Sequence, residues 1–318
     1  MKSPLPREPW DLIVILGPTA SGKTRIAVRL ALDLRSEIIS ADSRQAYRGL
    51  DIGAGKDLSE YIVQGRKIPC HLIDIVDPAV EEFSVFEFRK RFSACFSLLR
   101  SKGVLPILAG GTGLYLESVL LDYPLVEVAE NPSLRKELAG LDGEALERRL
   151  LSFHPSLHNT TDFQERDRLI RAIEIAEGSR NREEAGGASV GVARPLVIGV
   201  RWDRPVLRER ITGRLEQRIR GGMIDEVREL REKGVSWETL HRLGLEYRYV
   251  SLYLQGRLSF DEMFRTLNTR IHQFAKRQET WFRRMETRGI PIHWVDRGDY
   301  DAVRALVFGA GAKRLPGK

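Results

Sequence analysis

The 318-residue sequence predicts an α/β fold in which a parallel-sheet core is interrupted by a helical insertion domain. Short apolar runs rich in Val and Ile alternate with segments of helical periodicity, as in a parallel sheet with right-handed crossovers. A glycine-rich loop joins the first such run to the first helical segment. Between residues 123 and 194 the chain turns polar and helical in pattern with no good strand, which indicates an insertion.

The strands and helices of the core can be placed in order along the chain. Buried parallel strands are continuous apolar runs, and six segments qualify: 11–16, 37–40, 68–75, 104–110, 196–202 and 290–296. Helical spacing of apolar residues predicts helices over 23–34, 83–103 and most of 205–290, with Gly103 as a C-cap. Residues 1–122 and 195–318 should therefore form the core with a C-terminal helical part, and residues 123–194 the insertion.

Composition narrows the class of protein and its partners. Lys and Arg outnumber Asp and Glu by 51 to 44, and the net charge of +7 favours an anionic partner, nucleic acid before a membrane surface. Cys70 and Cys95 form no CxxC and lack zinc-like spacing, so a reducing cytoplasm fits. The N-terminus lacks a signal-peptide core, and no apolar run approaches transmembrane length, so we expect a cytoplasmic protein without a membrane span.

The loop "GPTASGKT" at residues 17–24 has the form Gly, four residues, Gly-Lys-Thr. It lies between a predicted strand and a predicted helix, the context of a phosphate-binding loop, and so predicts a P-loop NTPase-like core. Backbone N–H groups and the helix N-terminus favour an anion there. Lys23 would reach the terminal phosphate, and Thr24 would hold Mg²⁺. The remaining predicted phosphate contacts are Gly17, Thr19, Ala20, Ser21 and Gly22.

Two further segments follow predicted strands, where ligands of open α/β sheets bind. Asp42 follows the second strand and has three readings: a turn or N-cap aspartate, a Mg²⁺ ligand, or a general base. Ser43, Arg44 and Gln45 come next and can hydrogen-bond a planar base. Thr112 lies within "AGGTGLYLE", where Gly110, Gly111 and Gly113 allow backbone to approach a ligand. Thr112 could equally be an ordinary helix N-cap.

Basic residues collect on two predicted helices. Arg168 and Arg171 share a face, suited to a phosphate lid, an RNA backbone or simply solvent. Segment 261–289 has a stripe expected to be core, with basic residues on both flanks, which favours RNA contact. The stripe consists of Phe264, Leu267, Ile271, Phe274, Gln278, Phe282 and Met285, in which the Gln278 amide needs a partner. The flanks are Arg265, Lys276 and Arg283 on one side and Arg270, Arg277, Arg284 and Arg288 on the other.

Six motifs in this order resemble the bacterial type of the tRNA dimethylallyltransferase family, also called tRNA isopentenyltransferases. They cover most of the chain: "GPTASGKT", "ISADSRQAYRGLDIGAGK", "HLIDIVDP", "AGGTGLYLESVL", "RDRLIRAIEI" and "FAKRQETWFRR". The resemblance implies a monomeric, Mg²⁺-dependent transferase in tRNA processing. It would move a dimethylallyl group from dimethylallyl diphosphate to N6 of adenosine 37, beside the anticodon, in tRNAs that read codons beginning with U.

The resemblance also assigns roles to residues. The loop 17–24 would bind the donor's diphosphate with Arg220, and Asp42 would be the general base, with Thr112 contacting the diphosphate side of the reacting centre. The insertion would close over the anticodon stem-loop. Contacts to tRNA are implied for Asp42, Ser43, Arg44, Gln45, Asp167, Arg168, Arg171, Lys276, Arg277, Gln278 and Arg283.

The chain departs from the family pattern in places. Glu246 stands where many members carry glycine, and segment 214–227 is about one helical turn shorter than in many members. The zinc finger of eukaryotic members is absent. Three rival functions are a P-loop small-molecule kinase, an adenylate isopentenyltransferase acting on free AMP, and a non-enzymatic RNA-binding protein. The basic segment 261–289 counts against the first two, and Asp42 and Thr112 would be idle in the third.

Overall fold

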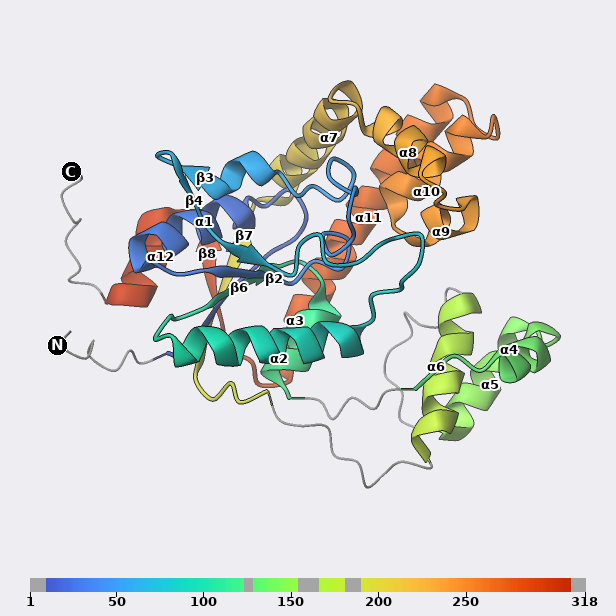
Figure 1. The fold of residues 1–318 in the computed structure, drawn as a ribbon, viewed down its shortest axis with the longest axis horizontal. Helices are drawn as coiled ribbons and strands as arrows, with labels where there is room; N and C mark the ends of the chain where they lie inside the picture. The colour runs from blue at the N-terminus through green and yellow to red at the C-terminus, as the bar shows by residue number, and fades with distance from the viewer. Residues whose placement is uncertain (1–9, 123–127, 154–165, 181–189, 310–318) are drawn as a thin grey trace. The chain divides into compact units, whose positions relative to one another are not determined.

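The computed structural model describes residues 10–122, 128–153, 166–180 and 190–309. Its contacts divide the chain into two compact units, 1–122 with 190–318, and 123–189. The first unit is built on a six-stranded sheet with the order β5-β2-β6-β1-β7-β8 and parallel pairing throughout (Figure 1). The strands are β1 (Leu12–Leu16), β2 (Ile38–Ser40), β5 (Cys70–His71), β6 (Ile107–Gly110), β7 (Pro195–Arg201) and β8 (Ile292–Asp296). The predicted parallel sheet is confirmed, although the run 68–75 contributes a strand of only two residues.

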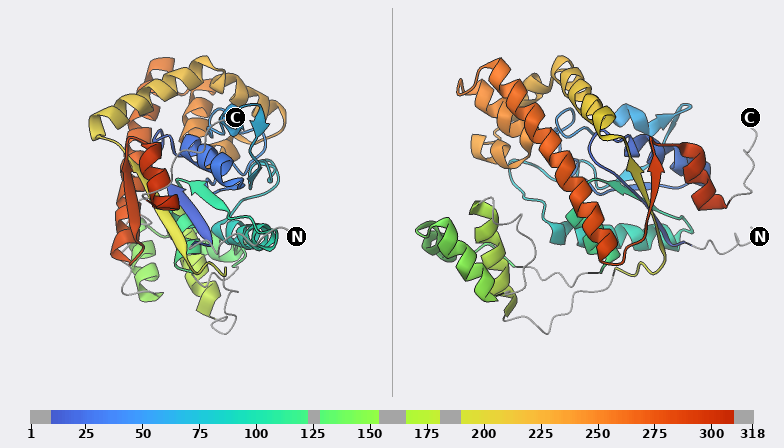
Figure 2. Two further views of the ribbon diagram at one scale, coloured as in Figure 1. Left: turned by 90° about the vertical axis from the view of Figure 1, so that its left-hand side faces the viewer. Right: turned by 180° about the vertical axis from the view of Figure 1, so that it is seen from behind.

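Both faces of this sheet are buried, which explains the continuous apolar runs. Along β1, Leu12, Val14 and Leu16 enter one hydrophobic cluster, whereas Ile13 and Ile15 enter another. Successive side chains of a strand point to opposite faces, so every residue of such a strand must be apolar. Helices α1 (Lys23–Leu34) and α12 (Tyr300–Phe308) cover one face, and α2 (Val85–Ser101) and α3 (Gly113–Leu120) cover the other (Figures 1 and 2).

Local signals set the ends of α2. The Ser84 hydroxyl accepts a hydrogen bond from the Glu87 N–H, which caps the helix start. Gly103 follows the last turn with a φ of 73°, a left-handed conformation that glycine adopts without steric cost. A short 3₁₀ helix, η1 (Leu58–Tyr61), and the antiparallel pair β3 (Ile62–Val63) and β4 (Arg66–Lys67) lie outside the main sheet.

The C-terminal helical part follows β7, as predicted. It comprises α7 (Arg204–Arg220), α8 (Met223–Glu232), α9 (Trp237–Arg242), α10 (Leu245–Leu254) and α11 (Phe260–Thr287). Helix α11 begins at a capping box between Ser259 and Glu262 and runs along the core (Figure 2). No helix among the described residues is long and apolar enough to span a bilayer.

The predicted apolar stripe of α11 is correct except at Phe274, which is 39% exposed. The buried positions continue from Ile271 to Ala275 and then Gln278, so they keep the four- and three-residue steps of one helix face. Phe274 falls beside that face, between the basic flank and the core.

The second unit is helical, with α4 (Pro132–Ala139), α5 (Gly143–Phe153) and α6 (Arg166–Arg180). Leucines of the three helices form its own small core, for example Leu138, Leu146 and Leu169. Its boundary differs from the predicted 194, because residues 190–194 belong to the first unit. Val190 is buried there, and Asp11 accepts hydrogen bonds from the N–H groups of Ala193 and Arg194, both at 2.9 Å.

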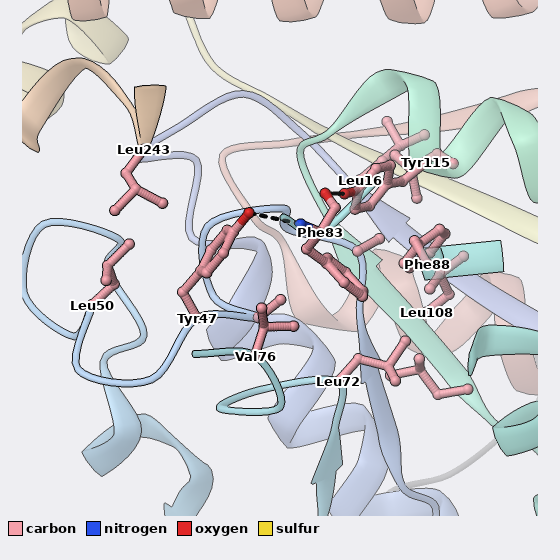
Figure 3. Packing of buried hydrophobic residues seen from close by; sticks show 14 of the residues in the cluster. Leu16, Tyr47, Leu50, Leu72, Val76, Phe83, Phe88, Leu108, Tyr115 and Leu243 are labelled. Carbon is pink, nitrogen blue, oxygen red and sulfur yellow. Dashed lines mark hydrogen bonds between the residues drawn. The ribbon is translucent and has the colours of Figure 1, made fainter. Parts of the chain in front are cut away.

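Three aromatic residues, Tyr47, Phe83 and Tyr115, connect the segment after β2 to the start of α2 and to α3. The Phe83 N–H donates to the Tyr47 hydroxyl at 2.8 Å, and the Tyr115 hydroxyl donates to the Phe83 carbonyl at 3.1 Å (Figure 3). The Tyr115 ring stacks on Phe88 with centroids 4.2 Å apart. The segment after β2 is thereby fixed to α2 and α3 at both polar and apolar contacts.

Helix α11 is anchored to α3 through a fully buried carboxylate. Glu117 accepts hydrogen bonds from Arg284 and Arg288, both at 2.8 Å. These two arginines of the predicted basic flank therefore serve the fold. The Glu117 side chain is fully buried, so its negative charge is stabilised by these two arginines and not by water.

Replacing Glu117 with Ala should lower the free energy of unfolding by about 2 kcal/mol, because two partly exposed arginines lose a buried partner. Urea denaturation measures the change. Glu229→Ala is the control, since Glu229 pairs with Lys233 on the surface and should cost under about 0.5 kcal/mol. Equal losses in the two variants would contradict the anchoring role.

Candidate active site

The loop after β1 is held in a special conformation by donors from the β7–α7 segment. Ala20 and Gly22 have φ values of 62° and 86°. The Ala20 carbonyl accepts from Arg210 Nε at 2.9 Å, and the Ser21 carbonyl accepts from Trp202 Nε1 at 2.8 Å. Carbonyl oxygens repel phosphate, but both of these oxygens are hydrogen-bonded to Arg210 and Trp202 and so are not offered to an anion. The loop is thus shaped to receive an anion.

Gln278 of α11 bridges the phosphate loop to the glycine turn after β6. Its Oε1 accepts from the Thr19 N–H at 2.8 Å, and its Nε2 donates to the Gly111 carbonyl at 2.8 Å. The side chain is buried, and this satisfies the polar position in the apolar stripe. Gln278 had been expected to contact tRNA, but both ends of its amide hold the site together instead.

The glycine turn makes room for neighbouring protein atoms. A Cβ at Gly110 would lie 2.2 Å from the Ala41 carbonyl oxygen, and one at Gly113 would lie 2.4 Å from the Trp281 ring. At Gly111 it would lie 2.5 Å from the Gln278 amide. The close neighbours of the turn are the end of β2, helix α11 and, at Gly111, the phosphate-loop residues Gly17 and Lys23. This close approach places the carboxyl ends of β2 and β6 against each other.

Asp42 and Thr112, the predicted catalytic pair, are brought together there. The Thr112 hydroxyl accepts from the Ser43 N–H at 3.2 Å, and the Thr112 N–H donates to the Ala41 carbonyl at 3.3 Å. Thr112 occupies the N-cap position of α3, but its hydroxyl makes no capping bond. Asp42 Oδ1 accepts from the Arg44 N–H at 3.2 Å, as in an Asx turn. The turn reading of Asp42 is therefore present in the structure, and it leaves Oδ2 for other chemistry.

Lys23 lies among charges of both signs at the start of α1. Burial lowers its pKa to about 8, helped by the Arg214 and Arg218 guanidinium groups and opposed by the Asp42 and Asp57 carboxylates. These shifts record that two arginines and Asp42 act on the ammonium group across a single site. A bound polyphosphate would relieve the repulsion among the cations. Thr24, in the first turn of α1, adds a neutral oxygen beside Lys23.

The arginine of α7 that was predicted to bind the diphosphate, Arg220, lies away from the phosphate loop. Arg220 is 81% exposed and pairs with Glu216, so the structure does not bring it to the phosphate loop. Arg210 contacts the loop instead, and Arg214 and Arg218 follow it at four-residue steps on the same face of α7. These two arginines contact Asp57 and Gly53 in the segment after β2, and their charges lower the pKa of Lys23. That spacing was visible in the sequence and could have identified Arg214 and Arg218. Arg220, two residues on, points to another face.

The other residues predicted to contact RNA differ in how far the structure exposes their side chains. Gln45 is buried, and both ends of its amide are hydrogen-bonded within the protein: Oε1 accepts from Ser40 Oγ, and Nε2 donates to the Gly55 carbonyl. Ser43 and Arg44 are half-buried beside Asp42. Lys276, Arg277 and Arg283 are exposed on α11. All of these belong to the first unit.

The remaining predicted contacts lie on α6 in the second unit. Arg171 contacts Glu174 and the Val128 carbonyl, so its guanidinium also supports that unit's fold. The side chains of Asp167 and Arg168 lie outside the described residues.

Fold and site together define an α/β enzyme that binds a phosphorylated substrate on a P-loop, with a carboxylate and a hydroxyl at the adjacent strand ends. Comparison with known proteins places it more closely. A family model described as IPP transferase matches residues 45–285, and one described as isopentenyl transferase matches residues 10–74.

Curated relatives and solved structures agree with these models. The chain is 56% identical over 299 residues to tRNA dimethylallyltransferase 1 of Syntrophus aciditrophicus, covering 94% of this chain and 98% of the relative. It is 53% identical over 289 residues to tRNA dimethylallyltransferase 2 of Bacteroides fragilis, covering 90% and 93%. The crystal structure of the full-length tRNA isopentenylpyrophosphate transferase from Bacillus halodurans matches with a TM-score of 0.66 at 32% identity, covering 95% and 96%. The chain belongs to the tRNA isopentenyltransferase family and is a prenyltransferase.

Gln278→Met should raise the KM for the diphosphate donor about tenfold, because the phosphate loop and the glycine turn lose their shared hydrogen-bonding partner. The KM for tRNA should stay within about twofold. Steady-state kinetics with each substrate varied in turn would measure both. Lys276→Met is the matched control on the exposed face, with the opposite pattern expected. A tRNA defect in Gln278→Met without a donor defect would contradict the bracing role.

Donor capture should weaken as the pH rises through about 8, where Lys23 loses its proton in the free enzyme. Below that pH the ammonium group is charged and attracts diphosphate, whereas above it the neutral amine does not. The kcat/KM for the donor, measured from pH 6.5 to 9.5, should fall on the alkaline side. Lys23→Met should be slower throughout and lack this alkaline fall. An unchanged alkaline fall in Lys23→Met would assign the titration to another group.

Proposed function

We propose that the protein transfers a dimethylallyl group from dimethylallyl diphosphate to N6 of adenosine 37 in tRNAs that read codons beginning with U. The products are N6-isopentenyladenosine and diphosphate. The observation that carries the proposal is the hydrogen bond from the Ser43 N–H, next to Asp42, to the Thr112 hydroxyl at 3.2 Å, with Asp42 close enough to Lys23 to influence its pKa. The setting is a cytoplasmic, monomeric enzyme.

The donor's diphosphate lies on the loop 17–24 in this proposal. The loop N–H groups, Lys23, Arg214 and Arg218 stabilise the negative charge that grows on the leaving diphosphate. Thr24 and the phosphate oxygens fit Mg²⁺, which is commonly bound through few protein oxygens and several phosphate oxygens. When bound, the ion would neutralise part of the leaving group's charge.

Asp42 is the general base of the proposed reaction. The adenine N6 amine is a poor nucleophile, because its lone pair is delocalised into the ring. As N6 bonds to C1 of the dimethylallyl group, the C1–O bond to diphosphate breaks and an N6 proton passes to the Asp42 carboxylate. Thr112 lies beside Asp42 on the diphosphate side of the reacting carbon. The adenine must leave its stack to reach this position.

The exposed basic residues of α11 supply the grip on the tRNA. Lys276, Arg277 and Arg283 are solvent-accessible on one helix and suit the phosphates of an anticodon stem-loop. Ser43 and Arg44, half-buried next to Asp42, would contact the extruded base region. The helical insertion, with Asp167, Arg168 and Arg171, would close over the stem-loop.

Incubation with Mg²⁺, dimethylallyl diphosphate and an anticodon stem-loop carrying A36-A37-A38 tests the proposal. Mass spectrometry should find one dimethylallyl unit on A37, and none on free AMP offered in parallel. ATP serves as a rival donor. Phosphorylation of a small molecule from ATP, with no RNA product, would instead make the protein a kinase and overturn the proposal.

Asp42→Asn should slow single-turnover transfer by about 10²- to 10⁴-fold, because the amide keeps the shape but cannot accept the N6 proton. Filter binding should show tRNA affinity within about threefold of the original. Asp225→Asn is the control, since it makes the same chemical change at an exposed carboxylate of α8 that pairs with Arg228, and it should retain most of the rate. Near-normal turnover of Asp42→Asn would exclude Asp42 as the general base.

A further inference from the structure

Arg218 is held against the backbone of the segment after β2. Its Nη1 donates to the Gly53 carbonyl at 3.3 Å, and its side chain is 12% exposed. A Cβ at Gly55 would lie only 1.6 Å from Nη2, so the guanidinium occupies the space that a side chain there would need. Arg218 Nε is buried and has no hydrogen-bond partner among the described residues. The group is therefore fixed in place while one N–H still lacks an acceptor.

Glu246, in the first turn of α10, supplies the carboxylate next to this guanidinium. Its Oε1 lies 3.8 Å from Arg218 Nη1, and its side chain is 20% exposed. Burial raises the pKa of Glu246, and the cations that oppose this rise are Arg218, Arg214 and Arg44. The pair is within ion-pair range but makes no direct hydrogen bond, so Glu246 attracts Arg218 without occupying its donors.

The need for such a carboxylate follows from the neighbours of Arg218. Arg214 lies one helical turn before it on α7, and like charges at this spacing repel. Lys23 adds a third cation to the same site. Arg214 has its own carboxylate, Asp57, at 2.5 Å. Without Glu246, Arg218 would keep the Gly53 carbonyl and the more distant Asp57 carboxylate, which already binds Arg214, against the repulsion of two cations.

We propose that Glu246 is a positioning residue for the transfer reaction, holding the Arg218 guanidinium beside Arg214 and Lys23 so that its positive charge acts on the donor's diphosphate. The inference rests on the proposed diphosphate site. Glu246 itself touches no substrate in this account and acts through Arg218. Loss of its charge lets Arg218 move away from Arg214 and Lys23, toward solvent, and the site loses a preorganised cation.

Glu246→Gln tests this role, because it removes the charge with little change of shape. The KM for dimethylallyl diphosphate should rise about tenfold, whereas the KM for the anticodon stem-loop should stay within about twofold. Glu246→Asp, which keeps the charge, should recover part of the loss. Glu229→Gln is the control, since it removes an exposed carboxylate of α8 that pairs with Lys233. It should leave both KM values unchanged.

A double-mutant cycle with Arg218→Gln separates positioning from general damage to the fold. Arg218→Gln alone should raise the donor KM strongly, and adding Glu246→Gln should change it no further, because the residue through which Glu246 acts is already gone. Equal effects of Glu246→Gln in both backgrounds would overturn the proposal, as would an unchanged donor KM in Glu246→Gln alone. If Arg218→Gln itself left the donor KM unchanged, Arg218 would have no part in diphosphate binding and the positioning role of Glu246 would be overturned, whereas the transfer reaction is tested independently by the mass of the RNA product.

Discussion

The arrangement of the active site depends on the Gln278 amide, which connects three segments far apart in sequence. It bonds to Thr19 in the phosphate loop and to Gly111 in the glycine turn, while its own helix packs on the core. Helix α11 is fixed in turn by Glu117, whose buried carboxylate binds Arg284 and Arg288. A buried amide with both ends satisfied tolerates little displacement, because any shift leaves a polar group unpaired. The long basic helix thus positions the phosphate site and also carries exposed cations.

A second constraint is electrostatic. The phosphate site gathers Lys23, Arg214 and Arg218 within a partly buried space, and such a group of cations repels itself in the absence of an anion. Asp57 and Glu246 offset the repulsion at the two arginines, one carboxylate for each. Both acids come from segments outside α7, so the loop after β2 and helix α10 are coupled to the phosphate site.

Some residues of the candidate site could be grouped from the sequence and others could not. The loop 17–24, Asp42 and Thr112 follow strands, and the rule that ligands bind at the carboxyl ends of parallel strands was enough to group them. Gln45 and Gln278 were assigned to tRNA, whereas the structure buries both amides in hydrogen bonds to loops. An amide looks the same in sequence whether its partner is a nucleic acid or a backbone group. Arg220 was implied by the family resemblance alone, and the shorter segment 214–227 shifts the alignment of its arginines, so that the exposed Arg220 lies on another face of α7.

The sequence by itself determined the α/β class, the succession of strands and helices along the chain, the phosphate loop and the family, because these depend on local periodicity and short spacings. Only the tertiary structure decided which arginines lie near the phosphate loop and which side-chain amides are buried in hydrogen bonds within the protein. It also decided that Phe274 lies outside the core. Several of those outcomes depend on contacts between residues more than 150 positions apart, such as Thr19 and Gln278 or Gly53 and Arg218. Local sequence pattern carries no information on such pairings, because they are selected by the packing of whole helices on the sheet.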